Sequence, residues 1–346
     1  MPKRKRIEPT MKIVLAAPNY PQPRGNTVTV RRIAANLQKL DVQTEIVSIT
    51  GENSASTLPD ADLVHGFHAY YFHQFLQQLD QQPKSYIITM TGTDLNADLF
   101  NPEKRPGVLS TLEGAAAIHV FDEAAKNTVL QEAPQFEGKV FAIVQGTSDF
   151  SPANHSQLEK KAGTFLFVLP AGIRKVKNIP FAINALAKLH EAIPNIRLWL
   201  AGPVLEQTEA DIVLALAEQH AGWLTYIGEI PHAEMGAVFE KADVVLNTSH
   251  SEGQPAAILE AMGYGKPVLV SNVAGNNGMV ENGKTGYLFN DQKQFLDYAA
   301  ELINNNEARQ RIGMQAKQYA AAHHSPSFEA EALLKIYTSI TQQDIT

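Results

Sequence analysis

The chain lacks cysteine entirely and has no long apolar run among its 346 residues. Without thiols, the chain has no disulfides, cysteine nucleophiles or cysteine-ligated metal sites, which suits a reducing compartment. No apolar stretch reaches the roughly 20 residues that a membrane-spanning helix needs, and no signal-peptide pattern opens the chain. We therefore expect a cytoplasmic protein without an integral membrane segment.

Positive charge is also scarce. Lys and Arg number 29 against 36 Asp and Glu, for a formal net charge of -7. Capture of nucleic acid through its phosphates needs a surplus of cations, so we expect no nucleic-acid partner. The one basic run, Lys3 to Arg6, precedes the first strand pattern and is interpreted as a terminal tail.

The rest of the composition is that of an ordinary globular protein. Hydrophobic residues make up 44% of the chain, and its length suggests about two domains. In the first half, short apolar runs of strand length alternate with helical patterns. We predict strands at 11–17, 44–49, 63–67, 86–91, 116–121 and 140–144. Such alternation indicates a parallel sheet covered on both faces.

The second half repeats this alternation. Strands are predicted at 165–169, 196–201, 224–227, 244–247 and 267–270, and helices at 179–191, 209–218, 233–241 and 255–262. The fold class is therefore α/β, with two doubly wound, Rossmann-like domains in series and a linker within 146–163. We predict domains at 11–155 and 156–322, followed by a helical segment at 323–346. Ligands bind such sheets outside the carboxyl ends of the strands, so two sheets facing across a cleft would hold the chemistry there.

The most informative stretch, 249–289, places Glu252 in a loop and Glu260 eight residues later on a predicted helix opened by Pro255. Gly253 lets the backbone approach a ligand, and Ala256 leaves the amides of the first helical turn open to a phosphate. Glu260 could accept hydrogen bonds from the two hydroxyls of a ribose, while Glu252 would face a sugar. The alternative is a pair of surface carboxylates. We favour the functional reading because the pair lies between two strands, at a sheet's carboxyl edge.

With its downstream glycine-containing tail at 278–286, this stretch resembles the family-4 retaining glycosyltransferases of the GT-B fold, and the resemblance covers nearly the whole chain. A closer similarity is to the glycosyltransferase 1 domain-containing proteins and the related bacterial selenosugar synthases. That similarity rests on the segments 24–29, 91–95 and 171–177.

The resemblance implies retaining transfer of a hexosyl or N-acetylhexosaminyl group from a nucleotide-sugar, preferably a UDP-sugar, to a small-molecule or glycan acceptor. It implies no cofactor and no required metal. Arg174 and Lys177 would neutralise the donor diphosphate, with Lys175 as an alternative to Lys177. The resemblance also implies that the 323–346 segment crosses back to the N-terminal, acceptor-side domain.

Further site residues follow the strand ends. Gly25 and Asn26 could bring backbone amides to the donor, although a simple turn is equally possible from the residues alone, and only the resemblance favours the donor site. The resemblance adds Gly228 and Gln254 to the donor side. Many family relatives carry a His where this chain has Thr91. On the acceptor side we predict Thr91, Thr93 and Asp94, with turn capping as the alternative role for Asp94.

Two other functions fit the same architecture: a nucleotide-sugar epimerase and a catalytically silent nucleotide-sugar-binding protein. An epimerase would need further acid/base carboxylates facing the sugar, whereas Glu252 and Glu260 already have binding roles. His65, His68 and His73 lie close in sequence, but their spacing favours packing over a metal site.

Overall fold

The computed structural model describes residues 11–52, 54–147 and 158–343. The chain divides into two compact units: unit 1 comprises 1–146 and 326–346, and unit 2 comprises 147–325. The predicted boundary at 155/156 falls outside the described residues. The chain re-enters unit 1 at Pro326, a few residues beyond the predicted 322/323 boundary, because helix α12 (Asn306–His323) runs to His323.

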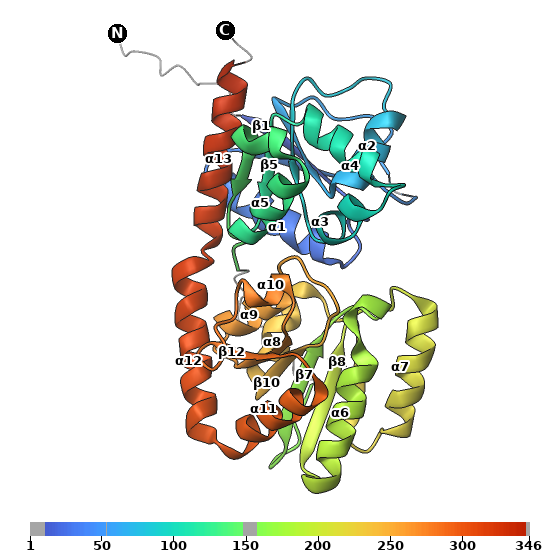
Figure 1. The fold of residues 1–346 in the computed structure, drawn as a ribbon, viewed down its shortest axis with the longest axis vertical. Helices are drawn as coiled ribbons and strands as arrows, with labels where there is room; N and C mark the ends of the chain where they lie inside the picture. The colour runs from blue at the N-terminus through green and yellow to red at the C-terminus, as the bar shows by residue number, and fades with distance from the viewer. Residues whose placement is uncertain (1–10, 53, 148–157, 344–346) are drawn as a thin grey trace, which may run out of the picture. The chain divides into compact units, whose positions relative to one another are not determined.

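Unit 1 is built on a six-stranded parallel sheet (Figure 1). Its strand order is β2-β1-β3-β4-β5-β6. The strands are β1 (Lys12–Ala17), β2 (Gln43–Ser48), β3 (Leu63–Phe67), β4 (Tyr86–Thr89), β5 (Ala117–Val120) and β6 (Val140–Ala142). Along β1, Ile13 and Leu15 pack into one hydrophobic cluster, while Val14 packs into another. Side chains of successive strand residues point to opposite faces, so this sheet is covered on both sides.

Helices cover the two faces of this sheet. They are α1 (Gly25–Gln38), α2 (Ala69–Gln78), α3 (Thr93–Asn96), α4 (Arg105–Gly114), α5 (Glu123–Glu132) and α13 (Pro326–Gln343), with 3-10 turns η1 (Asp98–Phe100) and η2 (Pro134–Lys139). The last helix packs against α1, and its Tyr337 is fully buried. Arg32 on α1 donates to both carboxylate oxygens of Glu329 on α13, at 2.8 and 2.9 Å. The C-terminal helix is therefore an integral part of unit 1.

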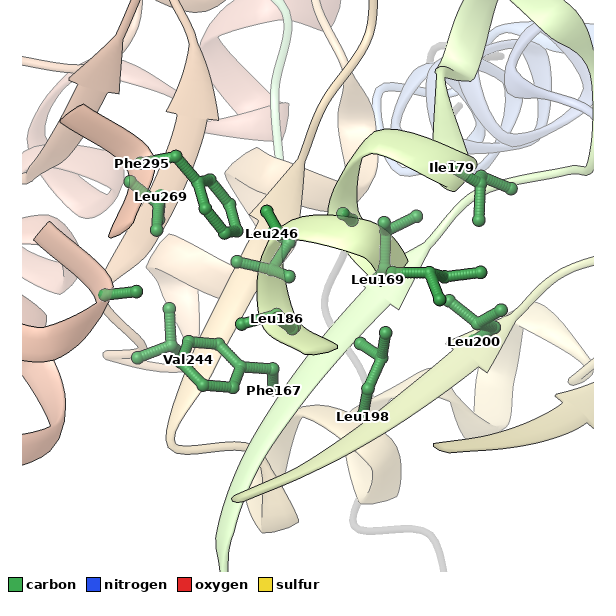
Figure 2. Close-up of a cluster of buried hydrophobic side chains, with 14 of the residues drawn as sticks. Phe167, Leu169, Ile179, Leu186, Leu198, Leu200, Val244, Leu246, Leu269 and Phe295 are labelled. Carbon is green, nitrogen blue, oxygen red and sulfur yellow. The ribbon is translucent and has the colours of Figure 1, made fainter. Parts of the chain in front are cut away.

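Unit 2 contains a second six-stranded parallel sheet, in the order β12-β11-β10-β7-β8-β9. The strands are β7 (Phe165–Pro170), β8 (Ile196–Ala201), β9 (Leu224–Gly228), β10 (Val244–Asn247), β11 (Val268–Ser271) and β12 (Gly286–Phe289). Phe167 and Leu169 point into the cluster drawn in Figure 2, whereas Val168 packs on the opposite face. The prediction of two doubly wound parallel sheets is confirmed; β12 was not predicted.

The helices of unit 2 are α6 (Ile179–Ala192), α7 (Gln207–Gln219), α8 (Met235–Lys241), α9 (Ala256–Gly263), α10 (Ala274–Asn277), α11 (Gln292–Asn304) and α12, with 3-10 turns η3 (Lys175–Lys177) and η4 (His232–Glu234). Within the described part of the chain, no helix combines the length and apolar character needed to cross a membrane.

Candidate active site

Two loops meet at the carboxyl edge of the unit 2 sheet, where β7 and β10 are neighbours. The loop after β7 carries Lys177, and the loop after β10 carries Glu252. Thr248 Oγ1 donates to the carbonyl of Lys177 at 3.0 Å, and the His250 N–H donates to the carbonyl of Val176 at 2.8 Å. These bonds tie the two loops together and explain why residues 75 positions apart come into contact.

Lys177 and Glu252 form a largely buried ion pair. Lys177 Nζ lies 2.5 Å from Glu252 Oε1, and the two side chains are 15% and 8% exposed. The same oxygen accepts hydrogen bonds from Asn247 Nδ2 at 2.9 Å and from Ser249 Oγ at 2.5 Å. Burial on its own raises the pKa of Glu252, but the Lys177 charge and the three hydrogen bonds outweigh it and hold this pKa below its ordinary value. The carboxylate is therefore ionised at neutral pH.

Arg174 lies just before η3 in the same loop as Lys177. Its Nε is buried and, among the residues described, has no hydrogen-bond partner. A guanidinium nitrogen removed from water without a partner is destabilising, and an anionic ligand would supply the missing acceptor. Lys175, the alternative to Lys177, is exposed, and its backbone N–H donates to Glu206. Lys177 is thus the lysine that contacts Glu252.

Helix α9 follows the Glu252 loop and carries Glu260 on its second turn. Glu260 is 4% exposed, and its Oε1 lies 2.7 Å from His232 Nε2. Pro255 precedes the helix instead of opening it, because its ψ of 106° is extended. The first turn has no acidic residue, and no side chain among the described residues caps it, so the amides of Ala256 and Ala257 are available to an anion. Gln254, just before Pro255, is 8% exposed.

Two glycines shape this edge of the sheet. Gly228 ends β9 at φ +77°, a conformation that favours glycine. Gly275, on α10, packs so tightly that an added Cβ would lie 1.6 Å from the carbonyl oxygen of Gly253. Gly275 therefore allows α10 to reach the Glu252–Gly253 loop. Sequence reasoning missed Gly275 and the side-chain contact of His232 with Glu260; the position of His232 just beyond the end of β9 is the signal that could have identified this contact.

In unit 1, Gly25 and Asn26 form the first turn of α1 after β1. A Cβ at Gly25 would meet nothing within 4 Å, so packing inside unit 1 does not require glycine there. Arg24 Nε and Thr27 Oγ1 are buried and have no hydrogen-bond partner within the described parts of the chain. Two buried polar groups that lack a partner among the described residues therefore flank the predicted Gly25–Asn26 turn in sequence.

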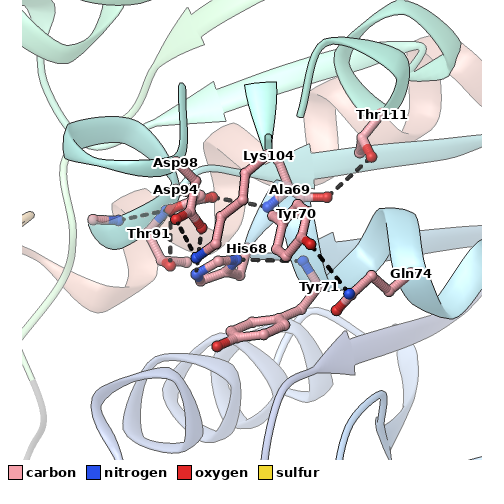
Figure 3. Close-up of polar contacts among 11 residues, drawn as sticks. His68, Ala69, Tyr70, Tyr71, Gln74, Thr91, Asp94, Asp98, Lys104 and Thr111 are labelled. Carbon is pink, nitrogen blue, oxygen red and sulfur yellow. Dashed lines mark hydrogen bonds and ion pairs between the residues drawn. The ribbon is translucent and has the colours of Figure 1, made fainter. Parts of the chain in front are cut away.

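Asp94 organises the loop that follows β4 (Figure 3). It is fully buried; its Oδ2 accepts from the Ala69 N–H at 2.8 Å, and its Oδ1 accepts from the N–H groups of Thr91 and Gly92 at 2.9 and 3.0 Å. Thr91 is half-buried and Thr93 is exposed. These contacts are those of a turn-organising residue, which places Thr91 and Thr93 at the edge of a fixed loop.

The histidines of unit 1 are packed side chains. His65 is fully buried and bonded to Thr89 and Tyr337. His68 follows β3 at φ +70°, and its ring lies 4.3 Å from that of Tyr71 (Figure 3). Beside it, Lys104 Nζ contacts Asp98 Oδ1 at 2.8 Å. The described residues contain no group of three or more side chains suited to holding a metal.

Comparison with known families and curated proteins places these features in context. The family described as "Glycosyl transferases group 1" matches residues 150–319. Glycosyltransferase 1 domain-containing protein 1 from Xenopus tropicalis is 31% identical over 249 residues, covering 69% of this chain and 72% of that protein. Alpha-monoglucosyldiacylglycerol synthase from Acholeplasma laidlawii is 26% identical over 187 residues, covering 53% of this chain and 47% of that protein.

Solved structures share the fold over nearly the whole chain. Sucrose-phosphate synthase from Thermosynechococcus elongatus matches with a TM-score of 0.80 at 17% identity, covering 96% of this chain and 100% of that one. Alr3699/HepE from Anabaena, in complex with UDP and glucose, matches with a TM-score of 0.77 at 17% identity, covering 95% and 100%. At such identities the likeness concerns the fold.

Proposed function

The chain belongs to the glycosyltransferase group 1 family, with its GT-B fold, and from this premise we propose that it transfers a hexosyl or N-acetylhexosaminyl group from a UDP-sugar to a small-molecule or glycan acceptor. The transfer retains the anomeric configuration and uses no metal. The observation that carries the proposal is the buried Lys177–Glu252 pair, together with an Arg174 nitrogen in the same loop that has no partner among the described residues. UDP is the proposed nucleotide because the structurally similar HepE binds it.

In the proposed donor site, different residues bind the ribose, the diphosphate and the sugar of the nucleotide-sugar. Glu260 receives the ribose hydroxyls, since a carboxylate can accept several hydrogen bonds besides its contact with His232. The amides that open α9, together with Arg174 and Lys177, hold the diphosphate. Glu252 and Gly253 face the transferred sugar. We assign the acceptor to the carboxyl edge of unit 1, where Thr91 and Thr93 lie.

The proposed reaction needs no nucleophile from the protein. The bond between the anomeric carbon and the diphosphate oxygen breaks, and the acceptor oxygen bonds to the same carbon from the same face. The acceptor's proton passes to the departing phosphate oxygen. Negative charge grows on the diphosphate as it leaves, and Arg174 and Lys177 stabilise it, which is the role that a metal plays elsewhere. Correct placement of the donor and the acceptor supplies the rest of the rate enhancement.

Donor turnover tests this proposal. The protein is incubated in EDTA with UDP-, GDP- or ADP-sugars and a panel of acceptors, and both the released nucleotide and the anomeric configuration of the product are recorded. We expect UDP release, a product of retained configuration, and loss of both in Lys177→Met and Glu252→Gln. A change in the sugar while it is still attached to UDP would indicate an epimerase. Binding without turnover would indicate a silent binding protein.

A further inference from the structure

Asn276, on α10, has a fully buried side-chain amide whose NH₂ group and oxygen differ in their hydrogen bonding. Its Nδ2 donates to the Ser271 carbonyl at 2.9 Å and to Asn247 Oδ1 at 3.2 Å. Its Oδ1 has no hydrogen-bond partner among the residues described. Burying an amide oxygen without a partner is destabilising, so the reason for an asparagine here lies in its NH₂ group.

That NH₂ group sets the orientation of a second amide. Asn247 Oδ1 accepts from Asn276 Nδ2 and also from the Ser249 N–H at 3.1 Å. With two donors at its oxygen, the Asn247 amide must turn its own NH₂ group the other way. Asn247 Nδ2 accordingly donates to Glu252 Oε1 at 2.9 Å. A one-way chain of donors therefore runs from Asn276 through Asn247 to the Glu252 carboxylate.

The backbone around this chain is equally constrained. Ser271 Oγ donates to the Ser249 carbonyl at 2.7 Å, and Gly275 packs directly on Gly253. The Glu252 loop is thus fixed by contacts with α10 and with the end of β11. Among the described residues, Asn276 has no hydrogen bond to Glu260, which lies on a different helix and contacts His232.

We propose that Asn276 is a positioning residue for the transferred sugar: by fixing the direction of the Asn247 amide, it keeps Glu252 supplied with a donor and oriented towards the sugar. This inference rests on the proposed function, in which Glu252 faces the sugar of the donor. Asn276 therefore acts on the affinity for the sugar and not on the affinity for the nucleotide.

The most direct test is Asn276→Asp, which keeps the shape and replaces the NH₂ group by an oxygen. The new carboxylate faces Asn247 Oδ1, and repulsion turns the Asn247 amide so that its oxygen faces Glu252. The measured quantity is the ratio of the Kd for UDP to the Kd for UDP-glucose or UDP-N-acetylglucosamine, whichever the parent binds more tightly, from calorimetry at pH 7.5. We expect the ratio to fall about tenfold or more, with the Kd for UDP changed by less than about twofold.

A pH series separates positioning from damage to the fold. As the pH falls towards 5.5, protonation of the introduced carboxylate restores a donor, so the ratio should recover in Asn276→Asp while the parent ratio shows no such rise. Asn277→Asp, on the exposed neighbour, adds the same charge and should keep the parent ratio. If Asn276→Asp does not fold, Asn276→Ser provides the same comparison at neutral pH.

An unchanged ratio in a folded Asn276 variant would overturn the inference, as would equal loss of UDP and UDP-sugar affinity. The proposed function fails by a different result: a parent protein that binds no nucleotide, or that binds UDP-sugars no more tightly than UDP.

Discussion

A buried chain of hydrogen bonds in unit 1 determines how its stability depends on pH. Tyr337 OH lies 2.7 Å from His65 Nδ1, and His65 Nε2 lies 2.6 Å from Thr89 Oγ1. Thr89 Oγ1 lies 2.8 Å from His119 Nδ1, and His119 Nε2 lies 3.0 Å from the Ile143 carbonyl. Because a carbonyl can only accept, His119 Nε2 carries a hydrogen. If each donor and acceptor is then assigned in turn along these hydrogen bonds, both imidazoles are neutral and the Tyr337 hydroxyl is the first donor.

The sign of the pH effect follows from the two pKa shifts. Burial lowers the pKa of both His65 and His119, and the neighbouring His119 lowers that of His65 further. Below the ordinary pKa of 6.5, the unfolded chain binds protons that the folded unit does not. Stability is therefore complete above that pH and falls as the pH drops below it. Two groups that stay neutral in the folded unit cost at most about 3 kcal/mol at one pH unit below their unfolded pKa.

The assay is urea unfolding at pH 7.5, 6.5 and 5.5. Both tryptophans, Trp199 and Trp223, belong to unit 2, so unit 1 is followed by hydrogen exchange of peptides from β3 to β5. The matched control is the double variant His65→Gln/His119→Gln, which lacks both titrating groups and should lose less stability between pH 7.5 and 5.5, by up to about 3 kcal/mol. Equal pH dependence of parent and double variant would refute the reasoning.

Three further predictions concern single contacts. Arg32→Met should destabilise unit 1 by about 3–5 kcal/mol in urea unfolding, because it leaves the buried Glu329 carboxylate unpaired. The double variant Arg32→Met/Glu329→Leu should regain most of this stability. Equal destabilisation in the single and the double variant would contradict this prediction. Gly275→Ala should abolish binding of UDP-sugars in calorimetry, because its Cβ would displace Gly253, while Gly222→Ala, whose Cβ meets nothing within 4 Å, should not. Lys177→Met should raise the pKa of Glu252, since the lysine charge lowers this pKa in the parent, and NMR titration of the Glu252 carboxyl carbon in both proteins measures the change; an unchanged pKa would contradict this.

Most of the architecture could be predicted, because the patterns that indicate its strands and helices are short and lie within each element. The strand runs at 63–67 and 196–201 are short, apolar and flanked by helical patterns, and the structure confirms them as β3 and β8. β12, only four residues long, was missed. It lies at the edge of its sheet, and β11 is its one neighbouring strand in the part of the chain that the structure describes, so its formation depends on that partner more than on its own sequence.

In the candidate site, too, some residues could be predicted from the local sequence and others could not. Glu252 and Glu260 could be proposed from their place at a sheet's carboxyl edge, because parallel strands bring their carboxyl ends together. Arg174 and Lys177 were proposed through the family resemblance. Asn276 could not, since a buried asparagine and one in a loop look alike in sequence. Its role depends on contacts with residues on other strands. Pro255 was placed one position too far into its helix, an error typical of helix boundaries.

The central claim, a nucleotide-sugar site in unit 2 based on Glu260, is tested most directly by thermal unfolding with UDP, GDP or ADP in EDTA, followed by the tryptophan fluorescence of unit 2. The parent is compared with Glu260→Ala and with Glu218→Ala, which removes an exposed carboxylate. A ligand at a hundred times its Kd stabilises by about 2.7 kcal/mol. We predict a shift that UDP produces most strongly, that Glu218→Ala keeps and that Glu260→Ala loses. Absence of a shift with every nucleotide, or a full UDP shift in Glu260→Ala, would contradict the account.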